Sequence, residues 1–509
     1  MLAKVKSFAL DGLLGYPIDV EMDINSGLPS FEMVGLASTA TKESKERIRS
    51  AVKNSGFMYP TKRITINLAP ADTKKEGPSF DLAIAVAMLI ASGQLLSANY
   101  KDFIFLGELS LDGTLRHING VMPIIISAMQ AGYKKFVLSD DNAKEASYVE
   151  GIEAYSFQNL KGVAEFLNGA SAQMLVQNSF EASRNAHGYG VDFADVKGQS
   201  TAKRALEIAV SGGHNIIMIG PPGAGKTMLA KCVPTIMPEM TFEEAIEVTK
   251  VHSIAGTLDE NIGIVTTRPF RSPHHTTTVP ALIGGGSKAK PGEVSLANHG
   301  VLFLDEMPEY SRYALETLRQ PLEDRVVSVS RMVRTVEYPA NFMLVASMNP
   351  CPCGNYGSKT QICRCSVQQI HSYLSKLSGP LLDRIDLQIE VDSVSYDEFR
   401  TQRVEESSAK IKERTDHARE IQRERFKDDT ILTNAEMNEK HLKKYCQIDE
   451  NGERLLQKAF ERLNLSARGT TRILKVARTI ADLEGSEDIK NTHLAEAIQY
   501  RQLDRKYNG

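Results

Sequence analysis

Apolar and polar residues alternate with different periods along this chain, and the changes of period divide it into parts. Over residues 1–168, short apolar runs predict strands and longer ones predict helices. Strands are predicted at 63–68, 103–106 and 135–138, and helices at 80–91 and 124–131. Asp112 and Gly113 give a hairpin turn signal after the second of these strands. The first part is therefore predicted to be a domain of mixed strands and helices.

Residues 169–190 interrupt this pattern. They are rich in Ser, Ala, Asn, Gln and Gly, which predicts a linker. An α/β pattern returns over 191–395, and residues 396–509 are predicted to be helical. Nine basic and six acidic residues mix between positions 400 and 427, which favours a solvated helix with paired charges over a nucleic-acid-binding face. The fold class is thus α/β, with a helical C-terminal domain.

Composition narrows the kinds of protein that fit. The net charge of −3 argues against a globally basic nucleic-acid coat protein, although it leaves room for a local basic patch. The longest apolar stretch, 82–92, has 11 residues, short of the roughly 20 that span a bilayer. The N-terminus carries Asp11 within a short apolar run, so we expect no secretion signal. A cytoplasmic protein without a membrane span is expected.

The segment 220–227 fits the pattern G-x-x-x-x-G-K-[ST], a P-loop. Its residues are Gly220, Pro221, Pro222, Gly223, Ala224, Gly225, Lys226 and Thr227. An apolar strand at 215–219 precedes it and a helix follows, which is the setting this motif requires. Glycines let backbone N–H groups cradle phosphates, the lysine reaches the β- and γ-phosphates, and the threonine binds Mg²⁺. The motif therefore predicts an ATP–Mg²⁺ site.

Two acids follow a second apolar strand. The strand is 301–304, the acids are Asp305 and Glu306, and a helix is predicted at 313–322. This is a Walker B pattern, in which Asp305 holds Mg²⁺ and Glu306 orients the attacking water as general base.

Two further polar residues are candidates for the same site. A third strand, 341–348, ends at Asn349, where the amide could sense the γ-phosphate; the alternative is an ordinary Asn-Pro turn. Arg384 follows a predicted helix and could stabilise transition-state charge in a neighbouring subunit. Its alternative is a local ion cluster with Asp383 and Asp386.

The runs at 272–286, from Ser-Pro-His-His to Gly-Gly-Gly, and at 291–306, ending in Leu-Asp-Glu, resemble the magnesium-chelatase-related branch of AAA+ ATPases. Within it the chain is similar to the ComM/YifB group over essentially its whole length. The resemblance implies an AAA+ core at 191–395 and a helical lid after it. It implies a homo-oligomeric ring, commonly a hexamer, that moves single-stranded or branched DNA in branch migration during DNA uptake and recombination. It also implies that Asn349 is sensor 1 and Arg384 a finger acting in trans.

The resemblance extends to residues around these motifs. Arg468 is favoured as sensor 2, with Arg472 a close second. The alternating segment 325–337 is predicted to be a β-hairpin, which in this branch points at the ring's pore. Arg331 and Arg334 near its tip would then grip DNA phosphates without regard to sequence; a plain solvent-facing hairpin is the alternative.

Four of the six cysteines cluster in two C-x-C pairs: Cys351, Cys353, Cys363 and Cys365. Four thiolates could close a tetrahedral Zn²⁺ site in a long loop, but the spacing is tighter than usual, and reduced loop thiols are the alternative. Cys232 and Cys446 are predicted to be packing residues. Adjacent His274 and His275 do not share a helix face, so they are predicted to position a loop.

The first 168 residues resemble the Lon-protease domain, of the ribosomal-S5-like type, through segments 75–79, 107–113 and 118–122. Ser79 falls on the nucleophile position, but Met122 replaces the lysine that would activate it, so the domain is predicted to be noncatalytic. An ATP-driven DNA helicase or translocase is the favoured function. The alternatives are a chelatase-type motor that remodels a protein partner and a Lon-like protease.

Overall fold

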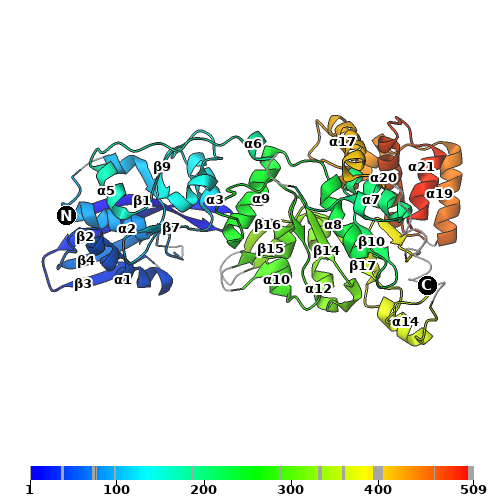
Figure 1. Ribbon diagram of the computed structural model, residues 1–509, viewed down its shortest axis with the longest axis horizontal. Coiled ribbons are helices and arrows are strands. Elements are labelled where there is room, and N and C mark those ends of the chain that lie inside the picture. The colour runs from blue at the N-terminus through cyan, green and yellow to red at the C-terminus, as the bar shows by residue number, and fades with distance from the viewer. Residues whose placement is uncertain are drawn as a thin grey trace. The chain divides into compact units, whose positions relative to one another are not determined.

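The computed structural model describes residues 2–35, 39–71, 75, 77–96, 99–184, 188–286, 289–330, 335–357, 361–393, 405–463 and 465–501. The chain forms two compact units (Figure 1). The first holds residues 1–186 and 242–266, and the second holds 187–241 and 267–509. A segment that follows the P-loop in sequence therefore belongs to the N-terminal unit.

A seven-stranded sheet, counted over the described residues, organises the first unit in the order β3-β4-β2-β1-β5-β8-β9. Its strands are β1 (Leu2–Asp11), β2 (Leu14–Asn25), β3 (Ser30–Val34), β4 (Arg63–Ala69), β5 (Phe103–Phe105), β8 (Lys135–Ser139) and β9 (Glu153–Phe157). β1, β2 and β4 pair antiparallel, whereas β1, β5, β8 and β9 pair parallel. Alternate residues of β2 are buried, as expected for a strand with one face on the core.

Helices pack on this sheet at the two places where the sequence predicts them, 80–91 and 124–131. Those of the first unit are α1 (Thr39–Asn54), α2 (Asp81–Ala91), α3 (Val121–Gln130), α4 (Ala143–Ala146), α5 (Leu160–Leu167) and α6 (Phe180–Arg184). Every residue of α2 is buried, as expected of a helix that is apolar all round. α3 begins three residues before the prediction because Pro123 is tolerated within a first turn. The predicted hairpin turn joins β6 (Glu108–Leu109) to β7 (Leu115–Arg116).

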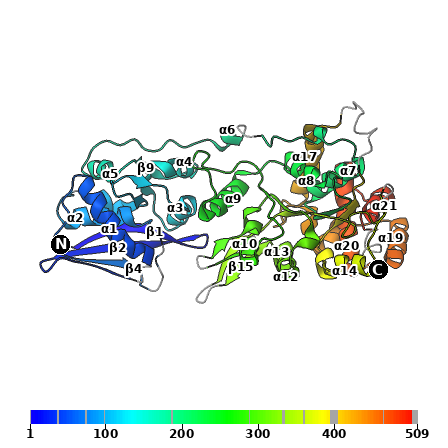
Figure 2. The same ribbon diagram turned by 60° about the horizontal axis from the view of Figure 1, so that its bottom comes forward.

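Helix α9 (Phe242–Ala255) completes the first unit by packing against α3 (Figure 2). The Ser253 hydroxyl accepts from the backbone N–H of Gly120 at 2.9 Å and donates to the Glu145 carboxylate at 2.5 Å. Glu145 also accepts from the backbone N–H of Met122 at 2.8 Å. One buried carboxylate thus joins three helices, α3, α4 and α9.

Burial raises the pKa of Glu145 from its ordinary 4.5 to about 7, against hydrogen bonds that lower it. The folded state then holds the proton more tightly than the unfolded state between pH 4.5 and about 7, so stability falls as pH rises through that window. We expect Glu145→Gln, which stays neutral, to be more stable than wild type at pH 8 by about 1–3 kcal/mol. Thermal unfolding at pH 5 and pH 8 measures this, with the exposed Glu150→Gln as control. An equal change at both pH values would contradict it.

A five-stranded parallel sheet, again counted over the described part of the chain, organises the second unit in the order β11-β14-β17-β10-β18. The strands are β10 (Ile216–Ile219), β11 (Phe270–Arg271), β14 (Val301–Leu304), β17 (Met343–Met348) and β18 (Leu387–Glu390). β10, the first along the chain, lies between β17 and β18, the last two. The chain therefore leaves β10 at a topological switch point, where parallel sheets bind ligands beyond their carboxyl ends.

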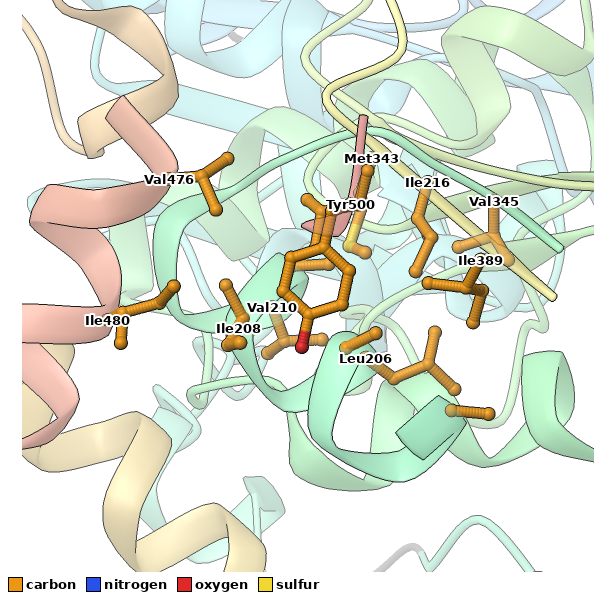
Figure 3. Close-up of a cluster of buried hydrophobic side chains, with 14 of the residues drawn as sticks. Leu206, Ile208, Val210, Ile216, Met343, Val345, Ile389, Val476, Ile480 and Tyr500 are labelled. Carbon is orange, nitrogen blue, oxygen red and sulfur yellow. The ribbon is translucent and has the colours of Figure 1, made fainter. Parts of the chain in front are cut away.

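The C-terminal helices share one hydrophobic core with this sheet. Leu206 and Val210 lie in a cluster with Ile216 and Val345 of the sheet and Ile480 of the C-terminal helices (Figure 3). The main helices are α7 (Ser200–Gly212), α8 (Lys226–Ile236), α17 (Ser408–Arg425), α18 (Glu439–Tyr445), α19 (Glu450–Leu463), α20 (Ala467–Leu483) and α21 (Asn491–Gln499). Two ion pairs of α17 lie within one turn, as the sequence predicts, whereas Arg414 and Arg425 pair instead with buried acids of α7 and α20. Among the described residues, no helix combines the length and hydropathy that crossing a bilayer needs.

One predicted helix is wrong, because the structure has two shorter helices in its place. The segment expected as a single helix at 313–322 is two short ones, α12 (Arg312–Thr317) and α13 (Arg319–Asp324). Pro321 has no N–H to donate to the carbonyl four residues earlier, and its ring crowds that carbonyl, so the helix breaks just before. The remaining helices are short: α10 (Val279–Ile283), α11 (Glu293–Leu296), α14 (Val367–Leu374) and α15 (Gly379–Leu382).

Candidate nucleotide site

The P-loop connects β10 to α8, and two of its glycines have left-handed backbone angles. Gly223 and Gly225 have φ of 77° and 86°, although a side chain at either would meet nothing within 4 Å. Backbone conformation, not space, therefore demands glycine at both positions. Gly220 differs, because a Cβ there would lie 2.1 Å from the backbone oxygen of Val391 beyond β18.

Lys226 begins α8 and is buried between the loop and the end of β17. Its Nζ donates to the backbone oxygens of Gly220 at 2.6 Å and Pro221 at 2.9 Å, and to Oδ1 of Asn349 at 3.3 Å. Burial lowers the pKa of Lys226, while the nearby Asp305 carboxylate acts to raise it. The structure thus brings the P-loop lysine and the predicted sensor together.

The two predicted Mg²⁺ ligands are also neighbours. The hydroxyl of Thr227 donates to Oδ2 of Asp305 at 3.0 Å. On the other side, the hydroxyl of Ser347 donates to Oδ1 of the same carboxylate. A hydroxyl at the start of the P-loop helix and a carboxylate at the end of a neighbouring strand are the protein ligands that nucleotide-bound Mg²⁺ uses.

Ser347 is a functional candidate that sequence reasoning missed. It is fully buried on β17, and the pairing of Leu304 with Ala346 places it level with Asp305. Its oxygen also accepts from the backbone N–H of Glu306 at 3.2 Å. A hydroxyl inside an otherwise apolar central strand was the available signal, because a buried polar group needs a partner.

Glu306 has left-handed backbone angles, φ 49° and ψ 49°, and an exposed side chain. Such a conformation is uncommon outside glycine and concentrates at functional positions, where neighbouring contacts hold it. In this protein, hydrogen bonds from the backbone N–H of Glu306 to the side chains of Asp305 and Ser347 hold that conformation.

The predicted finger and sensor-2 arginines gather around two acids of the same unit. Arg384 pairs with Glu323, and Arg468 lies 3.9 Å from the same carboxylate. Arg472 pairs with the buried Asp386. Burial acts to raise the pKa of Asp386, but Arg472 and other cations together hold it well below its usual range.

These contacts refine the predictions. The ion partner of Arg384 is Glu323, not the sequence neighbours 383 and 386. Within the described residues, none of the three arginines contacts Lys226, Thr227 or Asp305. Arg468 has a side chain 63% exposed, and Arg472 is engaged with a buried acid, which favours the former as sensor 2. Both assignments stay predictions.

Other predicted sites lie elsewhere in the second unit. Strands β15 (Val326–Ser330) and β16 (Thr335–Pro339) form the predicted antiparallel hairpin, whose tip with Arg331 and Arg334 lies outside the described residues. The thiols of Cys351, Cys353, Cys363 and Cys365 lie within 4.8 Å of one another, as a metal-holding group would. His274 hydrogen-bonds to Thr276 at 2.9 Å, in keeping with a loop-positioning role.

A P-loop, a strand-end acid pair and a strand-end asparagine on one edge of a parallel sheet define an ATPase of the AAA+ class. Three family models match the chain: "Magnesium chelatase, subunit ChlI" at 192–399, "Subunit ChlI of Mg-chelatase" at 20–142, and "Magnesium chelatase, subunit ChlI C-terminal" at 405–501. The chain belongs to the ComM/YifB family of these chelatase-related ATPases.

Three relatives illustrate the family. Competence protein ComM of Haemophilus influenzae is 45% identical over 507 residues, 99% of this chain and 98% of that protein. Protein YifB of Escherichia coli is 42% identical over 506 residues, again 99% and 98%. Lon protease of Flavobacterium johnsoniae is 26% identical over 171 residues, 31% of this chain and 20% of that one. The likeness to Lon is therefore partial.

Ser347→Ala should weaken Mg²⁺ binding about 10- to 100-fold, because such outer hydrogen bonds orient a metal-binding carboxylate. The Mg²⁺ dependence of ATP hydrolysis measures this. Ser328→Ala on β15 is the control, since that hydroxyl bonds to Glu337. An unchanged Mg²⁺ requirement would remove the positioning role from Ser347.

Proposed function

We propose that this protein is an ATP-dependent DNA motor, a helicase or branch-migration translocase that acts in DNA uptake and recombination. The observation that carries the proposal is the candidate nucleotide site, in which Lys226 contacts Asn349 and Thr227 contacts Asp305 at one sheet edge. The 45% identity to a protein named for competence supports a DNA role. The name of that relative is the reason for proposing DNA as the polymer along which the motor moves.

In the proposed reaction, the N–H groups of the P-loop and Lys226 hold the β- and γ-phosphates, and Thr227 and Asp305 bind Mg²⁺. Glu306 orients the attacking water, and Asn349 senses the γ-phosphate. Ser347 keeps the Asp305 carboxylate turned toward Thr227. Catalysis would come chiefly from placing charge where the transferring phosphoryl group develops it.

The motor is proposed to work as a homo-oligomeric ring, a hexamer, in the cytoplasm. Support comes from Arg384, Arg468 and Arg472, whose contacts in the described residues are with Glu323 and Asp386 and not with their own nucleotide site. Arginines that complete a site in trans would have this arrangement. When the ring assembles, Arg384 would leave Glu323 and bind the phosphates of the nucleotide held by the neighbouring subunit.

Arg384→Ala should lower the ATPase rate by about 10³–10⁵, the usual contribution of an arginine finger. Glu323→Gln is the matched variant, because it removes the same ion pair and keeps the arginine. ATP turnover at concentrations that assemble the ring separates the two roles. If Arg384 is a finger, ATP turnover should be lost in Arg384→Ala alone. If the ion pair has only a local role, both variants should show similar, small decreases in turnover.

DNA contacts in this proposal come from the β15–β16 hairpin. The chain is slightly acidic, so attraction to DNA must be local, and a ring would gather one hairpin from each subunit around its pore. Arg331 and Arg334 would contact phosphates, which carry no sequence information.

The experiment compares forked, duplex and single-stranded DNA in ATPase and strand-displacement assays. Wild type should hydrolyse ATP faster with DNA, and its affinity should fall steeply with salt. The double variant Arg331→Ala, Arg334→Ala should keep basal turnover and lose strand displacement. The control, Arg423→Ala with Arg454→Ala, removes equal charge from exposed helical positions. Glu306→Gln protein should bind DNA with ATP present and fail to move it.

A chelatase-type motor that remodels a protein partner is the second candidate, favoured by the three magnesium-chelatase family matches. It predicts no stimulation by any DNA and no effect of the hairpin variant in DNA assays. If assembled wild type neither binds forked DNA at low salt nor responds to it, this candidate replaces the DNA motor. Proteolysis is not proposed, because Met122 is apolar and fully buried at the position of the Lon lysine.

A further inference from the structure

The loop that follows β17 holds four thiols in an arrangement that fits one metal ion. The Sγ atoms of Cys351 and Cys353 are 3.4 Å apart, and each lies 3.7 Å from Sγ of Cys363. With Cys365, all four lie within 4.8 Å of one another. Four sulfurs around Zn²⁺ at bonds of about 2.3 Å form a tetrahedron with edges of about 3.8 Å. The observed separations are close to those edges.

The separations do not fit disulfides. A disulfide needs sulfurs about 2.05 Å apart, and it needs them in pairs. Here three sulfurs are nearly equidistant, and all four are free thiols. An equidistant set favours a shared central ligand over two bridges.

Backbone N–H groups also point at the sulfurs. The N–H of Tyr356 lies 3.3 Å from Sγ of Cys351, and those of Asn355 and Arg364 hydrogen-bond to Cys353. Gly354, between the first pair and these donors, has φ of 80°, a turn that only glycine makes without strain. Such N–H contacts stabilise thiolate charge and orient metal ligands.

The described residues of the loop, 350–357 and 361–366, bury few apolar side chains. Ile362, its one large aliphatic side chain, is 88% exposed, and Cys353 is exposed as well. Burial of large apolar side chains therefore contributes little to the fold of the described part of this segment. Metal binding can, because it supplies folding free energy to segments that have no core.

The same loop is in contact with the nucleotide site at two points. A Cβ on Gly354 would lie 2.5 Å from Cδ of Pro222, so the turn packs directly on the P-loop. At the far end of the loop, α14 carries the buried Tyr373, whose hydroxyl accepts from the backbone N–H of Asn349. The segment that carries the thiols is therefore in contact with the P-loop through Gly354, and the helix that follows it is in contact with Asn349 through Tyr373.

We propose that Cys351, Cys353, Cys363 and Cys365 bind one Zn²⁺ as a closed structural site, and that this ion holds the loop against the P-loop so that nucleotide binding depends on it. Four thiolates leave no position for substrate, which makes the site structural. Thiolates select zinc over magnesium or calcium, which prefer oxygen ligands. Without the ion, Pro222 and Asn349 lose the surface they pack on.

The first experiment is elemental analysis of protein purified without added metal, together with binding of a non-hydrolysable ATP analogue and Mg²⁺. Wild type should carry about one zinc per chain. The variant Cys353→Ser, Cys365→Ser should lose the zinc and bind the analogue about tenfold more weakly, equivalent to about 1.4 kcal/mol. The control Cys232→Ala, Cys446→Ala, which alters the two cysteines outside the cluster, should keep the zinc.

A second variant separates the metal from its effect on the P-loop. Gly354→Ala keeps all four thiols but places a methyl group against Pro222, so it should retain zinc and still weaken analogue binding. Gly190→Ala is its match, because Gly190 has φ of 66° and open space around it. Zinc well below one equivalent in wild type, with all four thiols freely titratable, would overturn the site. Loss of zinc with unchanged analogue affinity would overturn the coupling. Neither measurement involves DNA, so both are independent of the motor proposal.

Discussion

The parallel register of β14, β17 and β10 is the constraint on which the nucleotide site depends. Ile219 pairs with Met348, and Leu304 pairs with Ala346, so the carboxyl ends of the three strands lie within two residues of one another at one edge. A slip of one residue would turn every side chain to the opposite face of the sheet. Asp305 would then lose Ser347, and Lys226 would lose Asn349. The chemistry of the site is thus fixed by backbone pairing before any ligand is bound.

A second set of contacts ties this sheet to the C-terminal helices. Asp386, just before β18, accepts from the backbone N–H of Asn215 just before β10 at 3.0 Å and pairs with Arg472 of α20. His214 faces the same carboxylate at 3.6 Å. Removing any one partner of a buried charge lowers the stability of the fold, because the charge is then left incompletely paired. One carboxylate therefore holds helix α20 and the amino ends of two sheet strands, at the edge opposite the candidate nucleotide site.

Much of this arrangement can be predicted from sequence because it depends on local rules. The P-loop glycines, the apolar strand before them and the acids after β14 are each a short pattern with one physical reason. Ser347 and Glu323 could not be found in that way, since their roles depend on pairing register and on a contact 61 positions away in the chain. The break at Pro321 was predictable from the missing N–H, yet the apolar spacing around it favoured one helix. Parallel strand pairing and long-range ion pairs depend on tertiary structure, and the periodicity of apolar residues in the sequence does not predict them.

Helix α9 has a consequence for how the two units are joined. The chain passes between them at residues 186–187, at 241–242 and again at 266–267. Cutting the chain once between residues 169 and 190 would therefore leave the two fragments held together, because α9 stays bound to α3 and α4 through Ser253 and Glu145. Each unit is built from two separate stretches of the chain, so neither corresponds to one continuous segment that a gene fusion could add at an end. Any rearrangement in evolution that exchanged residues 1–186 alone would have had to preserve, or rebuild, the buried face that receives α9.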